Sequence, residues 1–140
     1  MLRGINKKLQ QPIYIVDDDK DDLFFVKNSF EKFSEIVNLK TFTNGRDLIN
    51  DLIKAEVEPV FILLDLNMPI MDGKEVLIWL KDHQEFSHIP TMIFTTSSRE
   101  EDVKLCQKHD CTFFRKPTLY RDLLHIVQVM MQMCDRAARV

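Results

Sequence analysis

Residues 60–65 read Val-Phe-Ile-Leu-Leu-Asp, an apolar run that ends on a carboxylate. A short run that is apolar at every position, rather than at alternate ones, is typical of a strand buried on both faces of a parallel sheet. Mostly apolar runs also lie at 13–16, 91–94 and 112–114, and residues 37–42 form a weaker one. We therefore predict four strands buried on both faces and a fifth that is less apolar.

Between these runs, apolar residues recur at helical spacing, which places one apolar stripe on each helix. Strand and helix alternate five times, and this alternation favours parallel strands joined by right-handed helical crossovers. The predicted fold class is α/β, a doubly wound five-stranded parallel sheet in the flavodoxin-like order 2-1-3-4-5 with helices on both faces. The stripes are Leu23, Val26, Phe30 and Phe33; Leu48 and Leu52; Val76, Leu77 and Leu80; and Leu123, Val127 and Met130.

Turn and capping residues agree with these boundaries. Asn44-Gly45 precedes the second helix, Asp72-Gly73 precedes the third, and Pro90 opens the fourth strand. Ser98 and Glu101 have the spacing of a capping box, which predicts that the fourth helix begins there.

Length and composition limit the number of domains and the possible partners. A chain of 140 residues with 45% hydrophobic residues can bury one core. We expect a tail at 1–11, one domain at 12–135 and a second tail at 136–140, with no further folded domain. A net charge of −3 offers no broad basic surface, so direct DNA binding is not expected.

The cysteines and the hydropathy pattern favour a cytoplasmic protein. Cys106, Cys111 and Cys134 are an odd number without metal-type pairing, so we expect reduced thiols. The N-terminus does not combine a basic region with a long apolar run, as a leader would, and no apolar run approaches the roughly 20 residues that span a bilayer. We therefore predict a cytoplasmic location and no membrane span.

Polar residues follow the strands where ligands bind in open α/β sheets, outside the carboxyl ends. Asp17 and Asp18 follow the first run, Asp65 the third, Thr95 ends the fourth, and Lys116 follows the fifth. If the first and third strands are neighbours, three carboxylates share one crevice, and each pair at 4 Å repels by about 4 kcal/mol at an effective dielectric near 20. Such a cluster favours a divalent cation, and all-oxygen ligands suit Mg²⁺ with a phosphate group.

Each of these residues also has a simpler interpretation. The acidic run at 17–22 can be a solvated start of a helix, where the macrodipole favours carboxylates. Lys116 can be a surface charge, and Thr95 can be an ordinary strand residue or part of a helix cap. Asp65 fits these alternatives less well, because no helix begins directly behind it.

Five motifs, in order over roughly residues 12–128, resemble the response-regulator receiver family. They are Val16-Asp17-Asp18, Leu64-Asp65-Leu66-Asn67-Met68-Pro69, Met71-Asp72-Gly73, Thr95 and Lys116-Pro117. The chain is similar to single-domain, chemotaxis-regulator-like receivers. The tripled aspartate at 17–19 and the run at 95–98 resemble receivers paired with phytochrome-type or other hybrid kinases.

The resemblance implies a phosphoryl-transfer site. Asp65 would be the phosphoacceptor, a carboxylate nucleophile that forms an acyl phosphate. For the Mg²⁺ cofactor, Asp18 would be a direct ligand, Asp17 would act through water, and Asn67 would contribute its backbone carbonyl. Lys116 would neutralise phosphoryl charge.

The resemblance also implies a conformational switch. Thr95 would move toward the phosphoryl group and Phe113 would turn inward, changing the surface around the fourth helix. Phe113 lacks the hydroxyl of the tyrosine often found there, and Thr96 is bulkier than the residue usual beside the switch threonine. In the family the bond between Lys116 and Pro117 is cis.

The implied protein is not an enzyme but a switch that is phosphorylated and dephosphorylated by its own catalysis. Its partners would be a sensor histidine kinase or a histidine phosphotransfer protein and an unknown downstream protein, with a homodimer possible. One alternative is a receiver-like interaction module that is never phosphorylated. Another is a small aspartyl-phosphate phosphatase, although that class needs a second aspartate where this chain has Asn67.

Overall fold

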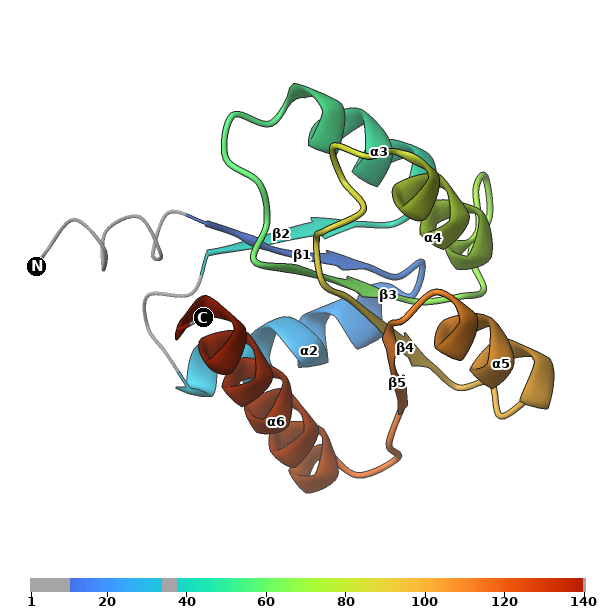
Figure 1. The fold of residues 1–140 in the computed structure, drawn as a ribbon. Coiled ribbons are helices and arrows are strands. Elements are labelled where there is room, and N and C mark those ends of the chain that lie inside the picture. Colours follow the sequence, from blue (N-terminus) through green and yellow to red (C-terminus); the bar gives the residue numbers. More distant parts are fainter. Residues whose placement is uncertain (1–10, 34–37, 140) are drawn as a thin grey trace, which may run out of the picture.

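The computed structural model describes residues 11–33 and 38–139, and in these residues five parallel strands form one sheet. The strand order is β2-β1-β3-β4-β5, as predicted, so β1 and β3 are neighbours (Figure 1). Val37, in the weaker predicted run, lies outside the described residues. The strands are β1 (Ile13–Val16), β2 (Leu39–Phe42), β3 (Phe61–Leu64), β4 (Thr91–Thr95) and β5 (Thr112–Arg115).

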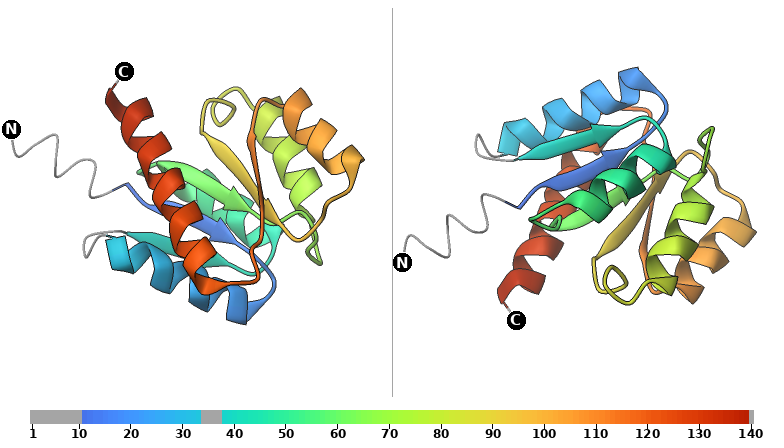
Figure 2. Two further views of the ribbon diagram at one scale, coloured as in Figure 1. Left: turned by 90° about the horizontal axis from the view of Figure 1, so that it is seen from below. Right: turned by 90° about the horizontal axis from the view of Figure 1, so that it is seen from above.

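Helices cover both faces of the sheet, which confirms the doubly wound α/β class. Helices α3, α4 and α5 lie on one face, and α2 and α6 pack side by side on the other (Figures 1 and 2). Right-handed crossovers require this division, because the chain leaves β1 in one direction across the sheet and then reverses. The helices are α2 (Lys20–Phe33), α3 (Gly45–Lys54), α4 (Gly73–Asp82), α5 (Glu100–Lys108) and α6 (Tyr120–Arg139).

The sheet separates two hydrophobic clusters, because successive strand residues point to opposite faces. On β1, Tyr14 and Val16 pack with α3 and α4, whereas Ile13 and Ile15 pack with α2 and α6. The strands β1, β3 and β4 are buried at every position. The prediction that residues 112–114 are buried on both faces is wrong, because β5 is an edge strand and its residues are only half-buried.

Two details of the helices differ from the prediction. Phe33 is 41% exposed, because it lies at the last residue of α2, beyond the part of the helix that contacts the sheet. The helix α5 begins at Glu100 with Arg99 as N-cap, so Ser98 does not form a capping box. In the loop before the helix, Ser97 Oγ accepts a hydrogen bond from Arg99 N at 3.2 Å, and no side chain caps the helix itself.

The other predicted helix starts are confirmed. The Asn44 side chain accepts a hydrogen bond from Asp47 N at 2.9 Å and caps α3. Asp72 and Glu75 form a reciprocal capping box at the start of α4. The helix therefore begins at a defined residue immediately after the loop that follows β3.

The remaining expectations about the chain have mixed outcomes. The three cysteines all lie in the described residues and form no disulfide, and the bond between Lys116 and Pro117 is trans rather than cis. Within the described residues, no helix has the length and apolar character needed to cross a membrane. The domain boundaries at 12 and 135 stay a prediction, and α6 continues to Arg139.

Candidate metal centre at the carboxyl edge of the sheet

Three carboxylates meet where β1 and β3 end, as the sequence predicts. Asp17, Asp18 and Asp65 each offer an oxygen atom, and these atoms lie within 4.8 Å of one another. The parallel pairing of Val16 with Leu64 brings the strand ends level. We call these three residues the acidic cluster. Two of its side chains are buried, at 4% and 7% exposure, while Asp18 is exposed and opens the cluster to solvent.

The backbone around Asp65 is held on two sides. Its N–H donates to Val16 O at 3.1 Å, and the next residue, Leu66, accepts a hydrogen bond from Gly73 N at 2.9 Å. A Cβ atom on Gly73 would lie 2.0 Å from the Asp65 carbonyl oxygen. Glycine is therefore required at this position, and the start of α4 fixes the strand end that carries Asp65.

Lys116 supplies the positive charge of the site. Its Nζ lies 2.5 Å from Asp17 Oδ2, 2.9 Å from Asp22 Oδ2 and 3.5 Å from Asp65 Oδ2. Its backbone N–H donates to Thr95 O at 2.8 Å, so the end of β4 sets its position. The side chain is 10% exposed, which excludes the interpretation of Lys116 as a solvated surface charge.

Burial and hydrogen bonding shift the pKa values of Asp17 and Lys116. Burial raises the pKa of Asp17 to about 6, against the opposing hydrogen bond from Lys116. Burial by itself would lower the pKa of Lys116, but the hydrogen bonds that it donates to Asp17 and Asp22 outweigh this effect and raise it. Lys116 therefore stays protonated at neutral pH, and one ammonium faces four carboxylates when Asp18 is included.

This excess of negative charge fits a divalent cation. Carboxylate oxygens from two strand ends are hard ligands of the kind that Mg²⁺ takes, and the exposed side of the cluster leaves room for water and a phosphate group. Lys116 neutralises part of the charge but not all of it. The donor set therefore matches the predicted metal.

The other predicted site residues lie around the cluster in different environments. Thr95 is fully buried, and its Oγ1 accepts a hydrogen bond from Ser97 N at 3.2 Å. Phe113 is half-buried and packs against the hydrophobic cluster under α3 and α4. Asn67 is exposed in the loop after β3. Thr95 thus ends β4, Phe113 lies within β5, and Asn67 lies three residues beyond the end of β3.

Asp22 is a functional candidate that the sequence did not single out. It sits in the first turn of α2, where the acidic run has a sufficient explanation as helix-stabilising charge. In the structure its carboxylate also contacts Lys116, which lies 94 residues away in the chain. The available signal was its spacing of five residues from Asp17, and that spacing alone does not indicate a contact.

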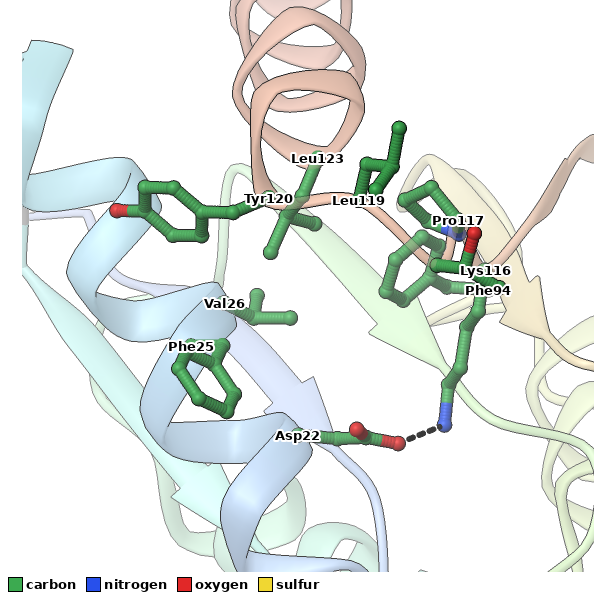
Figure 3. A pocket seen from close by; sticks show the side chains of 10 residues that line it. Asp22, Phe25, Val26, Phe94, Lys116, Pro117, Leu119, Tyr120 and Leu123 are labelled. Atoms are coloured by element: carbon green, nitrogen blue, oxygen red, sulfur yellow. Dashed lines mark hydrogen bonds and ion pairs between the residues drawn. The ribbon is translucent and has the colours of Figure 1, made fainter.

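A partly apolar pocket adjoins the ammonium of Lys116. Figure 3 shows Asp22 and Lys116 joined by their ion pair, with Phe25 on α2 and Tyr120 at the start of α6. Phe25, Tyr120 and Leu119, the last in the loop before α6, line the same pocket. The pocket has a volume of about 270 Å³. It thus continues the acidic site into an apolar surface between α2 and the start of α6.

The fold and this site together define a class of protein. A five-stranded parallel sheet with carboxylates after β1 and β3, a threonine ending β4 and a lysine after β5 is the arrangement of receiver domains. The family model described as response regulator receiver domain matches residues 13–128. The chain belongs to the response regulator receiver family, which acts in two-component signalling.

Several relatives are similar to this chain over most of its length. Response regulator Rcp1 of Synechocystis sp. is 39% identical over 129 residues, which cover 83% of each chain. The structure of the phosphorylated cyanobacterial phytochrome response regulator RcpA has a TM-score of 0.80 and 25% identity, covering 86% of this chain and 90% of that one. The Mn²⁺-bound form of Rcp1 has a TM-score of 0.77 and 30% identity, covering 86% and 91%.

Proposed function

We propose that this chain is a phosphorylation-dependent switch in which Asp65 accepts a phosphoryl group from a phosphohistidine donor with the help of Mg²⁺. The observation that carries the proposal is the contact of Lys116 with both buried aspartates, within an acidic cluster that is open on the side of Asp18. A Mn²⁺-bound relative and a phosphorylated relative are known among the similar structures, which supports the same chemistry here.

The proposed transfer exchanges one bond to phosphorus for another. A carboxylate oxygen of Asp65 attacks phosphorus, the bond between phosphorus and the donor imidazole nitrogen breaks, and the imidazole keeps the electron pair and takes a proton. Lys116 lies 3.5 Å from the attacking carboxylate and offsets the charge of the transferred oxygens. Asp18 would hold Mg²⁺ directly, Asp17 would hold it through water, and Asp65 and the Asn67 carbonyl would complete the protein ligands. When bound, the metal would supply the remaining positive charge.

The surface around the site suggests how the donor approaches. Phe24, Phe25 and Leu119 are 64%, 48% and 48% exposed, and the last two line the pocket beside Lys116. Exposed apolar groups beside polar chemistry are typical of a protein–protein contact. We propose that a sensor histidine kinase or a histidine phosphotransfer protein docks here, so that its phosphohistidine faces Asp65.

The proposed output is a change of surface rather than an enzymatic product. Thr95 would turn toward the phosphoryl group, and Phe113 would move with it to reshape the face from α5 to α6. A downstream protein, or a second copy of the chain, would read that surface. We place this switch in the cytoplasm, where phosphohistidine donors of this class present their phosphoryl groups, and without direct contact to DNA.

Labelling with a small phosphodonor tests the proposal. Acetyl phosphate with Mg²⁺ should add one phosphoryl group to the natural sequence, and Asp65→Asn should remove the label entirely, because the amide is not a nucleophile. The matched control is Asp82→Asn, an equal change at an exposed residue at the end of α4, and it should label normally.

Other outcomes would favour the alternatives. Label that persists in Asp65→Asn would refute the assignment of the acceptor. Release of many phosphate molecules from ester substrates per protein molecule would indicate a phosphatase. No response to phosphodonor and Mg²⁺ would indicate an interaction module that is not phosphorylated.

A further inference from the structure

A third buried carboxylate lies at the start of α5, outside the acidic cluster. Asp102 is 2% exposed. Its Oδ2 accepts a hydrogen bond from Ser97 Oγ at 2.5 Å, and its Oδ1 lies 3.2 Å from Lys74 Nζ. We call these three residues the Asp102 cluster. It joins the loop after β4, the first turn of α5 and the first turn of α4.

The charges of the Asp102 cluster are balanced. Burial alone would raise the pKa of Asp102, but the hydrogen bonds from Ser97 and Lys74 outweigh that effect and lower it. The carboxylate is therefore ionised at neutral pH and has one cation to itself. Only the carboxylate of this ion pair is buried, since the Lys74 side chain is 34% exposed. Such a pair adds little net stability, so fixing one conformation is the better explanation for its presence.

The Asp102 cluster is connected to the end of β4 through the backbone. Ser97 N donates to Thr95 Oγ1 at 3.2 Å, while Ser97 Oγ both donates to Asp102 and accepts from Arg99 N. Ser97 is thus held on its side chain and on its backbone. For the Thr95 hydroxyl to move toward Asp65, it must leave the N–H of a residue that Asp102 holds in place.

The same cluster also reaches the other side of the acidic site. Lys74 directly follows Gly73, whose Cα packs on the carbonyl of Asp65 and whose N–H bonds to Leu66 O. One carboxylate therefore links the loop that carries Thr95 to the helix that fixes Asp65. Two sites can be coupled when the element that connects them has two discrete arrangements. Here the connecting element would be the hydrogen-bonded link through Asp102.

We propose that Asp102 is a positioning residue for the switch: it holds Ser97, and through Ser97 the Thr95 hydroxyl, in the conformation of the unphosphorylated protein. Loss of the bond from Ser97 to Asp102 is then part of the change that follows phosphorylation. The inference rests on the proposed function, because it assigns Thr95 to the phosphorylated state. It adds a residue that neither touches the phosphoryl group nor binds the metal.

Affinity for a phosphoryl analogue tests this role. We would titrate beryllofluoride with Mg²⁺ into the natural sequence and into Asp102→Asn, using the fluorescence of Trp79 or calorimetry. Because the substitution weakens the hold on Ser97, the variant should bind the analogue more tightly, by roughly fivefold or more. Ser97→Ala should act in the same direction, and the double variant should show much less than the product of the two effects.

A matched control and a second readout separate positioning from folding. Glu101→Gln removes the same charge from the exposed neighbour of Asp102 and should leave the affinity unchanged within about twofold. A merely structural role for Asp102 would lower the melting temperature of Asp102→Asn without tightening analogue binding. If Asp102→Asn does not fold, Ser97→Ala carries the test, because it removes only the hydroxyl.

Each outcome bears on one claim. Unchanged or weaker analogue binding by the folded variants overturns the role of Asp102 while leaving Asp65 as acceptor. If the natural sequence itself binds no beryllofluoride with Mg²⁺, the proposed function fails and the role of Asp102 fails with it. Tighter binding by both single variants, with the control unchanged, supports the proposal.

Discussion

The acidic cluster and the Asp102 cluster are both buried carboxylate sites held by a lysine, and they differ in how far their charge is neutralised. One ammonium, that of Lys116, contacts two carboxylates of the acidic cluster, which follow β1 and β3, and also the carboxylate of Asp22 in α2. At the Asp102 cluster Lys74 and the Ser97 hydroxyl serve a single carboxylate. The first site has too few positive partners, and the second has enough.

This difference separates a chemical role from a positioning role. Desolvated carboxylates without enough partners raise the energy of the folded protein until a cation binds, so the acidic cluster is suited to a metal and a phosphoryl group. A carboxylate whose hydrogen bonds and charge are matched gains nothing from a metal. Such a carboxylate instead fixes the segments that carry its partners, here the loop with Ser97 and the first turn of α4 with Lys74.

The largest effect is expected when the ammonium of the acidic cluster is removed. Lys116→Met should lower the free energy of unfolding by about 3 kcal/mol, because it leaves buried carboxylates without their counter-charge. Mg²⁺ should restore part of this loss and stabilise the variant more than the natural sequence. Urea denaturation with and without Mg²⁺ measures both, with Lys108→Met at the exposed end of α5 as control. Equal stabilisation of the variant and the natural protein by Mg²⁺ would contradict the claim that a shortage of positive charge at the acidic cluster favours metal binding.

A smaller effect is expected at the balanced site, and it should depend on pH rather than on metal. Asp102→Asn should lower the free energy of unfolding by about 2 kcal/mol at neutral pH, since it loses hydrogen bonds to a charged group. The folded-state pKa of Asp102 lies below its unfolded value, so its contribution is complete above that unfolded value, about 4. The contribution is lost as the pH falls through the folded-state pKa.

Denaturation of Asp102→Asn and the natural sequence over a pH series tests this sign. The difference between them should be constant above about pH 5 and should shrink below about pH 4. Addition of Mg²⁺ should not change it. A difference that grows on acidification, or that Mg²⁺ abolishes, would mean that Asp102 is not a balanced ion pair of the kind described.

The smallest effect is expected at an exposed ion pair, which serves as the reference for the two sites with buried carboxylates. Glu100 and Lys104 form an exposed ion pair on α5, with Oε1 and Nζ 3.3 Å apart. Glu100→Gln should leave stability unchanged within the error of a denaturation experiment, because exposed pairs are screened by solvent. A loss as large as that of Asp102→Asn would show that general electrostatics of α5, rather than burial, explains both results.

The parts of the fold that follow from local patterns were predictable. An apolar run followed by a polar residue identifies both a buried parallel strand and its carboxyl end, so the neighbouring positions of Asp17 and Asp65 followed from the strand order alone. The starts of α3 and α4 were also predictable, because Asn44 and Asp72 cap them through residues three positions away.

The contacts that depend on packing were not predictable. Asp22 reaches Lys116 only because α2 packs against the sheet at one particular rotation, which a local pattern of charges does not specify. Ser97 rather than Ser98 forms the side-chain hydrogen bond at the start of α5, because the buried carboxylate of Asp102 accepts from the Ser97 hydroxyl. The half-burial of β5 likewise follows from its place at the edge of the sheet.

The central claim is that the excess negative charge beside Lys116 prepares Asp65, and no other residue, for phosphoryl transfer. After incubation with acetyl phosphate, sodium borohydride reduces an acyl phosphate to an alcohol, and peptide mass mapping locates the altered residue. We predict that Asp65 alone becomes homoserine, and only when Mg²⁺ is present. Conversion of a different residue, or equal conversion of Asp65 without Mg²⁺, would contradict the account.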